Sequence, residues 1–374
     1  MPEDLRLDEF TPRSELVVPE TCVDRARFRA IDAHNHLPVT DRRVASLIDW
    51  RELIAGLDAA NVSAVVNLSG GYGETLCANL EQLDQAYPGR FHTFCNIDFR
   101  EALTPGWLDR TLRQLRDDVA AGARGLKIFK RLGLAHRDPD GALFMPDDPR
   151  LFDIWELVGE LNIPVLIHTA DPTAFFRPLD RYNERWDELN AHPDWHFHGE
   201  AYPSFDALIA SLYCLIGAHP NTNFITAHVG CYPENLAFVS EMLDRYPNFC
   251  TDISARLAEL GRAPYSAREW CLRYQDRILF GTDFRPRPAM YRVHWRFLES
   301  DDQYFPYDPQ PENGTAASEG RVPFENSDGL SVDFTGHWSP IPTQGRWRIY
   351  GLSLPDEVLK KVYHDNAARL LRLA

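Results

Sequence analysis

The sequence predicts an α/β fold, a parallel (β/α)₈ barrel of the TIM type. Short apolar runs rich in β-branched residues alternate with longer segments of helical period, and this alternation occurs eight times. The strands of such a barrel are covered on both faces, so continuously apolar runs are expected rather than strict alternation. The 374 residues, of which 44% are hydrophobic, suffice for the core of one large barrel.

Eight strands are predicted from the apolar runs. In chain order they are Phe28–His34, Ala64–Leu68, Phe91–Ile97, Gly125–Phe129, Val165–His168, Asn223–His228, Phe249–Ile253 and Ile278–Thr282. The main alternative is a doubly wound open sheet, which usually has a glycine-rich phosphate loop after its first strand. Here the glycine-rich turn at 70–73 follows the second strand and has neither the dinucleotide spacing nor the P-loop lysine.

Helical segments separate the strands. The clearest are Leu47–Ala60, Trp107–Ala121, Leu151–Leu161, Phe205–Ala218 and Glu234–Tyr246. Ser204 is positioned to cap the fourth of them, and Pro233 is predicted in the first turn of the fifth. The last segment, Pro355–Leu373, reads as an amphipathic helix or helix pair that closes the barrel. Residues 1–374 are therefore predicted to form a single domain, with an N-terminal extension at 1–26.

Two long segments interrupt the alternation. Thr169–Tyr202 follows the fifth strand and is rich in aromatic residues, Arg and His, and 286–347 follows the eighth strand as an insertion. Both are predicted at the C-terminal mouth of the barrel, where βα loops form substrate pockets. In the first segment, Arg177, Arg181 and Arg185 recur every four residues and would form one basic stripe on a helix.

Ionisable residues stand where the predicted strands end. His34 and His36 close the first strand at an i, i+2 spacing that points both imidazoles to one face. Further strands carry Lys127, His168, His228 and Asp283. A buried ionisable group is costly unless it is paired or bound to a metal. Imidazoles with a carboxylate suit a divalent ion, Zn²⁺ in the first place and Mn²⁺ or Fe²⁺ as alternatives, rather than Ca²⁺ or Mg²⁺.

This ordered set of motifs resembles the amidohydrolase superfamily, and in detail the branch that contains aminocarboxymuconate-semialdehyde decarboxylase and related metal-dependent hydrolases. The resemblance covers nearly the whole chain, from Ile31 to the closing 365–371 segment Asp-Asn-Ala-Ala-Arg-Leu-Leu. It implies that one metal is held by His34, His36, His168 and Asp283. It also implies that His228 acts on the substrate or water, or binds a second metal.

Such a site favours hydrolysis by a metal-activated water, whose pKa falls to about 7 on zinc. Asp283 would accept the proton of that water, and His228 would polarise the scissile carbonyl or protonate the leaving atom. Asp32 would orient an imidazole or cap a barrel layer. The expected activity is metal-dependent hydrolysis of a C–N or C–O bond in a small polar substrate. The alternative is a non-oxidative decarboxylase of a carboxylated aromatic or enoic acid.

Several cations are candidates for binding a substrate carboxylate. Arg256 and Arg285 follow the seventh and eighth strands, and Arg177 lies in the loop after the fifth. Lys127 has two readings: a carbamylated bridge between two metals, or a lysine that only lines the wall. We expect one metal, because the branch that the chain resembles usually has one.

Composition excludes several partners. A net charge of −16 opposes binding to nucleic acid and to anionic membranes. There is no apolar run long enough to span a bilayer, and residues 1–20 lack the apolar core of a secretory signal. Seven scattered cysteines indicate reduced thiols and a cytoplasmic protein. The expected partner is a small-molecule substrate, and a homo-oligomer is a further possibility for this chain.

Overall fold

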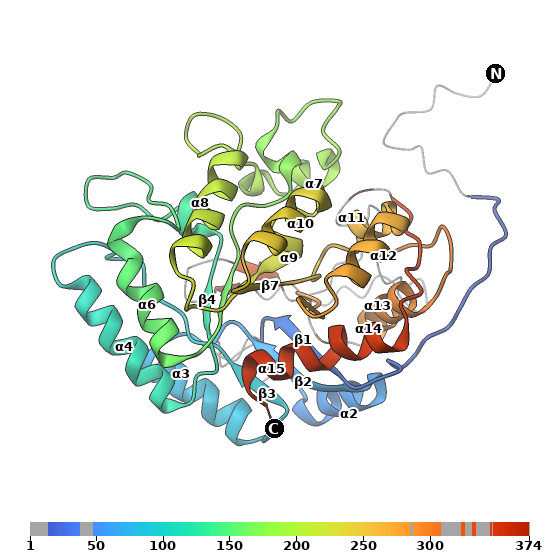
Figure 1. Ribbon diagram of the computed structural model, residues 1–374, viewed down its shortest axis with the longest axis horizontal. Helices are drawn as coiled ribbons and strands as arrows, with labels where there is room; N and C mark the ends of the chain where they lie inside the picture. The colour runs from blue at the N-terminus through green and yellow to red at the C-terminus, as the bar shows by residue number, and fades with distance from the viewer. Residues whose placement is uncertain are drawn as a thin grey trace.

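The computed structural model describes residues 14–37, 48–284, 286, 288–307, 345 and 347–373, with the backbone of 323–325 and 331–333. All eight predicted strands are present in the predicted order (Figure 1). They are β1 Ala30–Asn35, β2 Val62–Asn67, β3 Phe91–Thr93, β4 Leu126–Ile128, β5 Val165–Ile167, β6 Phe224–Thr226, β7 Phe249–Asp252 and β8 Ile278–Leu279. The barrel-type α/β fold expected from the alternation is confirmed.

The strands form two parallel sheets, β1-β2-β3 and β4-β5-β6-β7-β8. Regular pairing stops at the two seams between these sheets, which a few backbone hydrogen bonds bridge. At one seam the Cys95 N–H donates to the Gly125 carbonyl (2.9 Å). At the other, the N–H of Ala33 donates to the carbonyl of Phe280 (2.9 Å), and that of Asp283 to the carbonyl of His34 (2.8 Å). The second seam therefore places the carboxyl ends of β1 and β8 side by side.

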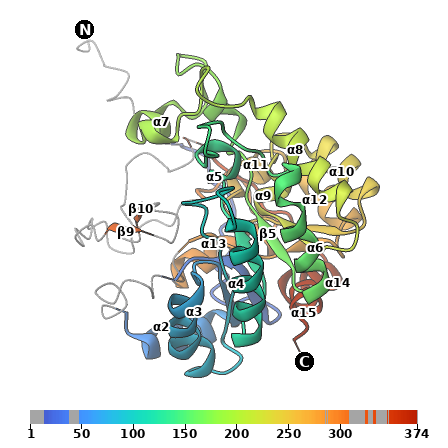
Figure 2. The ribbon, with the colours of Figure 1, turned by 90° about the vertical axis from the view of Figure 1, so that its left-hand side faces the viewer.

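Helices lie on the outside of the strands, with α4 and α6 side by side in Figures 1 and 2. The helices are α2 Trp50–Ala60, α3 Gly73–Leu80, α4 Trp107–Ala121, α5 Arg131–Leu134, α6 Phe152–Leu161, α7 Trp186–Ala191, α8 Phe205–Ala218, α9 Ala227–Gly230, α10 Leu236–Arg245, α11 Leu257–Arg262, α12 Pro264–Arg273, α13 Pro288–Glu299, α14 Asp356–Lys360 and α15 Asn366–Leu371. Two short strands, β9 Pro323–Glu325 and β10 Ser331–Asp333, pair antiparallel. None of the helices described is long and apolar enough to span a bilayer.

Helix starts follow their capping side chains. The Ser204 hydroxyl accepts from the N–H of Ala207, so the predicted cap of α8 is confirmed. The prediction for Pro233 is wrong, because α10 begins at Leu236, where the Asn235 side chain accepts from the N–H of Phe238. The segment between α14 and α15 packs against β8 and β1, with the Phe280 N–H donating to the carbonyl of Val362 (2.9 Å).

The two long segments differ from the expected loops. Residues 288–299, predicted within the irregular insertion, form helix α13, and residues 308–344 lie outside the described side chains. The predicted arginine stripe is wrong, since Arg177 has an extended backbone and Arg185 precedes α7. Arg185 is instead buried, and its guanidinium pairs with Glu188 and Glu259. The pairing with Glu259, which follows β7, does place the loop after β5 at the C-terminal face.

The N-terminal extension is tied to the C-terminal part of the chain. The N–H and hydroxyl of Thr21 donate to the Asp302 carboxylate (2.6 and 2.7 Å). Arg27 pairs with Asp356 in α14 and Glu299 in α13. Figure 1 shows this blue segment running beside α13 and α14. The extension is thus part of the folded unit from Thr21 onward.

An aromatic cluster behind β8 encloses a histidine. Trp295 packs on Phe280 and Tyr363, with ring centroids 4.7 and 4.9 Å apart. His294 is completely buried beside them, and its Nδ1 lies 2.8 Å from the carbonyl of Met290. Burial lowers the pKa of His294 to about 4, so the folded protein holds this imidazole neutral.

We expect this histidine to make the protein less stable in acid. Its pKa is about 4 when folded and near 6.5 when unfolded, so the unfolded chain binds the extra proton between these values. The contribution of His294 to the free energy of unfolding is fully present above pH 6.5. It falls by about 3 kcal/mol as the pH decreases toward 4. Urea unfolding of His294→Leu should therefore show a weaker dependence on acid than the wild type. His198→Leu, at an exposed position, is the control, and equal acid dependence in wild type and His294→Leu would contradict the argument.

Candidate metal centre

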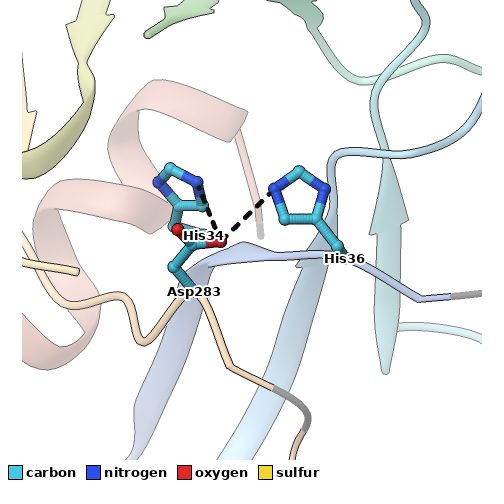
Figure 3. Close-up of side chains that lie close together, drawn as sticks. All are labelled: His34, His36 and Asp283. Carbon is cyan, nitrogen blue, oxygen red and sulfur yellow. Dashed lines mark ion pairs between the residues drawn. The ribbon is translucent and has the colours of Figure 1, made fainter. Parts of the chain in front are cut away.

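The ends of β1 and β8 bring three of the predicted residues together. The Nε2 atoms of His34 and His36 lie 3.6 and 3.4 Å from Oδ1 of Asp283. Figure 3 shows both imidazole rings facing this carboxylate from the same side of the strand. The potential ligand atoms of these residues all lie within 4.8 Å of one another. His34 is buried, while His36 and Asp283 are partly exposed.

The position of Asp283 is set by its own backbone conformation, because the residue lies beyond the end of β8. Its φ of 58° places it in the left-handed region, which is strained for a residue with a side chain. The hydrogen bond from its N–H to the His34 carbonyl holds it in that conformation. Left-handed residues also follow β5, β6 and β7 at Ala170, His228 and Ala255. Strained backbone thus gathers at the carboxyl ends of the strands, as is common at functional sites.

Asp32 supports this arrangement without touching an imidazole ring. Its carboxylate accepts from the N–H and hydroxyl of Thr282 (3.0 and 2.7 Å), the Tyr291 hydroxyl (3.0 Å) and the Asn35 amide (3.0 Å). Burial raises the pKa of Asp32 to about 6 against the opposing effect of these donors. Of its two predicted roles, the structure favours the polar layer beneath the site, because Asp32 anchors the residue that precedes Asp283.

His228 faces the same carboxylate from the end of β6. Its Nε2 lies 3.6 Å from Oδ2 of Asp283, and its ring stacks on that of His34 with centroids 4.9 Å apart. The backbone of His228 is left-handed, with φ 59°, and its N–H donates to Asp252 (3.0 Å). The structure thus places His228 beside the His34, His36 and Asp283 group.

The three imidazoles share one orientation. In each ring Nε2 faces Asp283, and Nδ1 contacts a second group: Asp252 for His34 (2.8 Å), Ser69 for His36 (2.8 Å) and the Ser254 carbonyl for His228 (2.9 Å). A carboxylate or carbonyl oxygen only accepts, so Nδ1 of His34 and of His228 carries the proton and Nε2 keeps its lone pair. Burial lowers the pKa of both His36 and His228 well below 6.5. Neutral imidazoles with directed lone pairs are the form that binds metals.

The spacing of these atoms fits a divalent ion. Ligands about 2.1 Å from a tetrahedral zinc lie about 3.4 Å from one another. The measured Nε2–Oδ1 separations are 3.4 and 3.6 Å. Lone pairs of nitrogen and of an anionic oxygen that face each other at this distance repel unless a cation lies between them. Asp283, His34 and His36 therefore suit a metal ion, with His228 beside them.

His168, the fourth predicted ligand, lies next to this group. Its ring meets that of His228 edge to face with centroids 4.4 Å apart, and its Nε2 lies 3.5 Å from Oδ1 of Asp171. Burial, together with the charges of Lys127 and Lys130, lowers the pKa of His168 well below 6.5. Neither of the two potential ligand groups found among the described residues includes His168. Its role as a ligand stays a prediction.

Cations line one side of the site. Lys127 is buried on β4, and its charge contributes, after burial, to the lowered pKa values of His36 and His168. Arg256 is buried after β7, and its charge likewise acts on His168 and His228. Lys127 and Arg256 thus face the interior.

Of the two other predicted cations, the structure describes only Arg177, which is not brought there. Arg177 is an exposed residue of the loop after β5. Arg285 lies outside the described residues.

Sequence reasoning missed the residues that orient the imidazoles. Asp252 ends β7 fully buried, Ser254 follows it, and Ser69 follows β2. A signal for Asp252 was present, since it closes an apolar strand as His168 closes β5. Ser69 and Ser254 carried no such signal in the sequence, because serine is common where strands turn into loops.

Known proteins share this architecture, although no curated protein matches the sequence. The structure of 2,6-dihydroxybenzoate decarboxylase from Rhizobium has a TM-score of 0.53 at 16% identity, covering 92% of this chain and 99% of that one. The structure of dihydroxybenzoic acid decarboxylase from Polaromonas sp. JS666, with bound manganese and the inhibitor 2-nitroresorcinol, has a TM-score of 0.51 at 16% identity. The alignment covers 92% of this chain and 97% of that one. An uncharacterized TIM-barrel protein from Bordetella bronchiseptica has a TM-score of 0.52 at 16% identity, with 92% of this chain and 99% of that one covered. These likenesses show the barrel fold.

The family is shown by the sequence itself. The profile of the amidohydrolase family matches residues 31–373, which begin at β1 and end after α15. The match therefore spans the whole barrel, including every residue of the site described above. This chain belongs to the amidohydrolase family.

Proposed function

We propose that the protein is a metal-dependent hydrolase that cleaves a C–N or C–O bond in a small polar substrate. The observation that carries the proposal is the orientation of three imidazoles, each with Nε2 toward Asp283 and Nδ1 engaged elsewhere. His34, His36 and Asp283 would hold the ion, with His168 as the further ligand that the family resemblance implies. The nitrogen-rich set favours zinc, and manganese or iron are the alternatives.

A divalent ion in this position would polarise a water molecule and lower its pKa. The Asp283 carboxylate would then accept a proton from that water and return it to the leaving atom of the substrate. His228 is held neutral, and its Nε2 can accept a hydrogen bond or a proton next to the same carboxylate. The Nδ1–H of His228 stays on the Ser254 carbonyl, so the ring keeps its orientation while Nε2 takes part.

Decarboxylation is the second candidate, favoured by the buried cations beside the histidines. Lys127 and Arg256 provide positive charge where a substrate carboxylate would be bound. Two of the solved structures with the same fold are dihydroxybenzoate decarboxylases. In that reaction Asp283 would first take up a proton from solvent and then donate it to the ring carbon as CO₂ leaves.

One screen separates the two reactions. The purified protein would be incubated with lactones, esters and amides of small carboxylic acids, and in parallel with hydroxybenzoates. Hydrolysis is measured by the appearance of the carboxylic acid product, and decarboxylation is measured by the release of CO₂. Hydrolysis products without CO₂ are expected. CO₂ release from a hydroxybenzoate without any hydrolysis would replace the hydrolase proposal with the decarboxylase.

Arg256 is expected to bind the substrate carboxylate. Its guanidinium is buried, and the hydrogen bond described for it goes to the neighbouring Ala255 carbonyl (2.7 Å). Arg256→Lys keeps the charge but loses the two parallel donors, so KM should rise roughly 10-fold or more with a smaller change in kcat. Steady-state kinetics with a carboxylated substrate and its methyl ester measure this. An equal rise in KM for acid and ester would contradict a carboxylate-binding role.

A further inference from the structure

Asp252 connects two histidines that come from different strands. It is the last residue of β7 and is completely buried. Its Oδ2 lies 2.8 Å from Nδ1 of His34, which lies in β1. Its Oδ1 accepts from the N–H of His228 and the N–H of Ser254, both at 3.0 Å, and from the Ser254 hydroxyl at 2.5 Å.

The two oxygens of this carboxylate have separate tasks. Oδ1 holds the left-handed turn at His228, whose φ of 59° is otherwise unfavourable, because it binds the N–H of that residue. Among the described residues, the donor to Oδ2 is the His34 ring. The Ser254 hydroxyl gives its single proton to Oδ1, so it can only accept from the Nδ1–H of His34 and of His228, each at 3.0 Å.

We propose that Asp252 is the positioning residue of the site: it fixes the His34 tautomer that leaves Nε2 free to bind the metal, and it holds His228 in place beside Asp283. The inference extends the proposed function, on which its metal-binding part rests. It assigns Asp252 no contact with substrate. Because a carboxylate cannot donate, His34 has no other neutral form in this environment than the one with the proton on Nδ1.

Asp252→Asn is the decisive substitution, because it keeps the shape and reverses the tautomer. Three donors face Oδ1, so the amide oxygen must take that place and its NH₂ must face His34. An NH₂ group donates, which forces the proton of His34 from Nδ1 to Nε2. A protonated Nε2 cannot bind a metal. Loss of such an orienting partner typically costs roughly 10- to 100-fold in metal affinity.

Two measurements test the proposal. Zinc affinity is measured by competition with a chelator, and the His34 tautomer by ¹⁵N NMR of histidine-labelled protein. The expected results are a 10- to 100-fold weaker zinc affinity in Asp252→Asn and a shift of the His34 proton from Nδ1 to Nε2. Wild-type zinc affinity in a folded Asp252→Asn protein would overturn the proposal. So would a wild-type His34 that carries its proton on Nε2, a result that stands even if the variant fails to fold.

Asp118→Asn is the matched control for the cost of altering a buried carboxylate. Asp118 is buried on α4 and accepts from the Gly73 N–H and the Gln114 amide, and none of the described histidines contacts it. It should lose stability but keep wild-type zinc affinity, and an equal loss of zinc affinity in both variants would contradict a specific role for Asp252. If the wild-type protein bound no metal, the proposed hydrolase would fail, whereas the His34 nitrogen signals would still decide the tautomer.

Discussion

Asp283→Asn should lower kcat by roughly 10²- to 10⁴-fold and change KM far less. The amide has the shape of the carboxylate but can neither accept a proton nor supply the negative charge opposite the imidazoles. Because Asp283 also lies 3.4 to 3.6 Å from the nitrogens that would bind the metal, the kinetics must be compared at equal metal content. Steady-state rates, with metal measured by elemental analysis on the same samples, make that comparison.

Asp276→Asn is the control for this substitution. Asp276 is an exposed carboxylate that pairs with Lys361 and precedes the amino end of β8, whereas the site lies at the carboxyl ends of the strands. It should leave kcat unchanged. An Asp283→Asn enzyme that keeps a tenth or more of the wild-type kcat would show that proton transfer at this position does not limit the reaction.

Replacing His34 or His36 by alanine should remove the metal. Each substitution takes away one imidazole that faces Asp283 and leaves the remaining atoms unable to complete a four-ligand site. Protein purified without chelator should contain about one divalent ion per chain, and either variant should contain little. Elemental analysis measures the content, and activity should fall in proportion to the ion lost.

His196→Ala provides the comparison. His196 lies in the loop after β5, and its ring contacts the Arg177 carbonyl rather than the site. Its replacement should keep the wild-type metal content. Full metal content and activity in His34→Ala would mean that the imidazole cluster is only a buried polar layer.

The strands could be predicted from sequence because buried parallel strands leave a local signature. Each is a short apolar run, and each was found within a few residues of its true bounds. β3 was predicted to reach Ile97 but ends at Thr93, after which a single bridge from Cys95 to Leu126 continues the pairing. Such a break depends on a neighbour distant in the sequence. The start of α10 after Pro233 has a local cause instead, since the side chain of Asn235 caps the helix at Leu236.

The site could be predicted only in part. Strand ends indicated His34, His36, His228 and Asp283, because each ionisable residue closes an apolar run. The sequence gives no indication of which ring nitrogen each imidazole presents, since partners on other strands decide that. Periodicity also suggested a basic stripe at Arg177, Arg181 and Arg185. It failed because Glu188 and Glu259 draw Arg185 into the interior.

The position of the site on the seam between β1 and β8 has a consequence for folding. His34 and Asp283 belong to the first and last strands of the barrel, and the hydrogen bond between their backbones is part of its closure. Contacts between such distant parts of a chain carry the largest loop-closure cost, so they form late. The cluster should therefore be absent from nascent or truncated chains. An ion that binds only the complete cluster would stabilise the folded state, because it binds the finished barrel and not the unfolded chain. Metal binding would therefore shift the folding equilibrium toward the native protein.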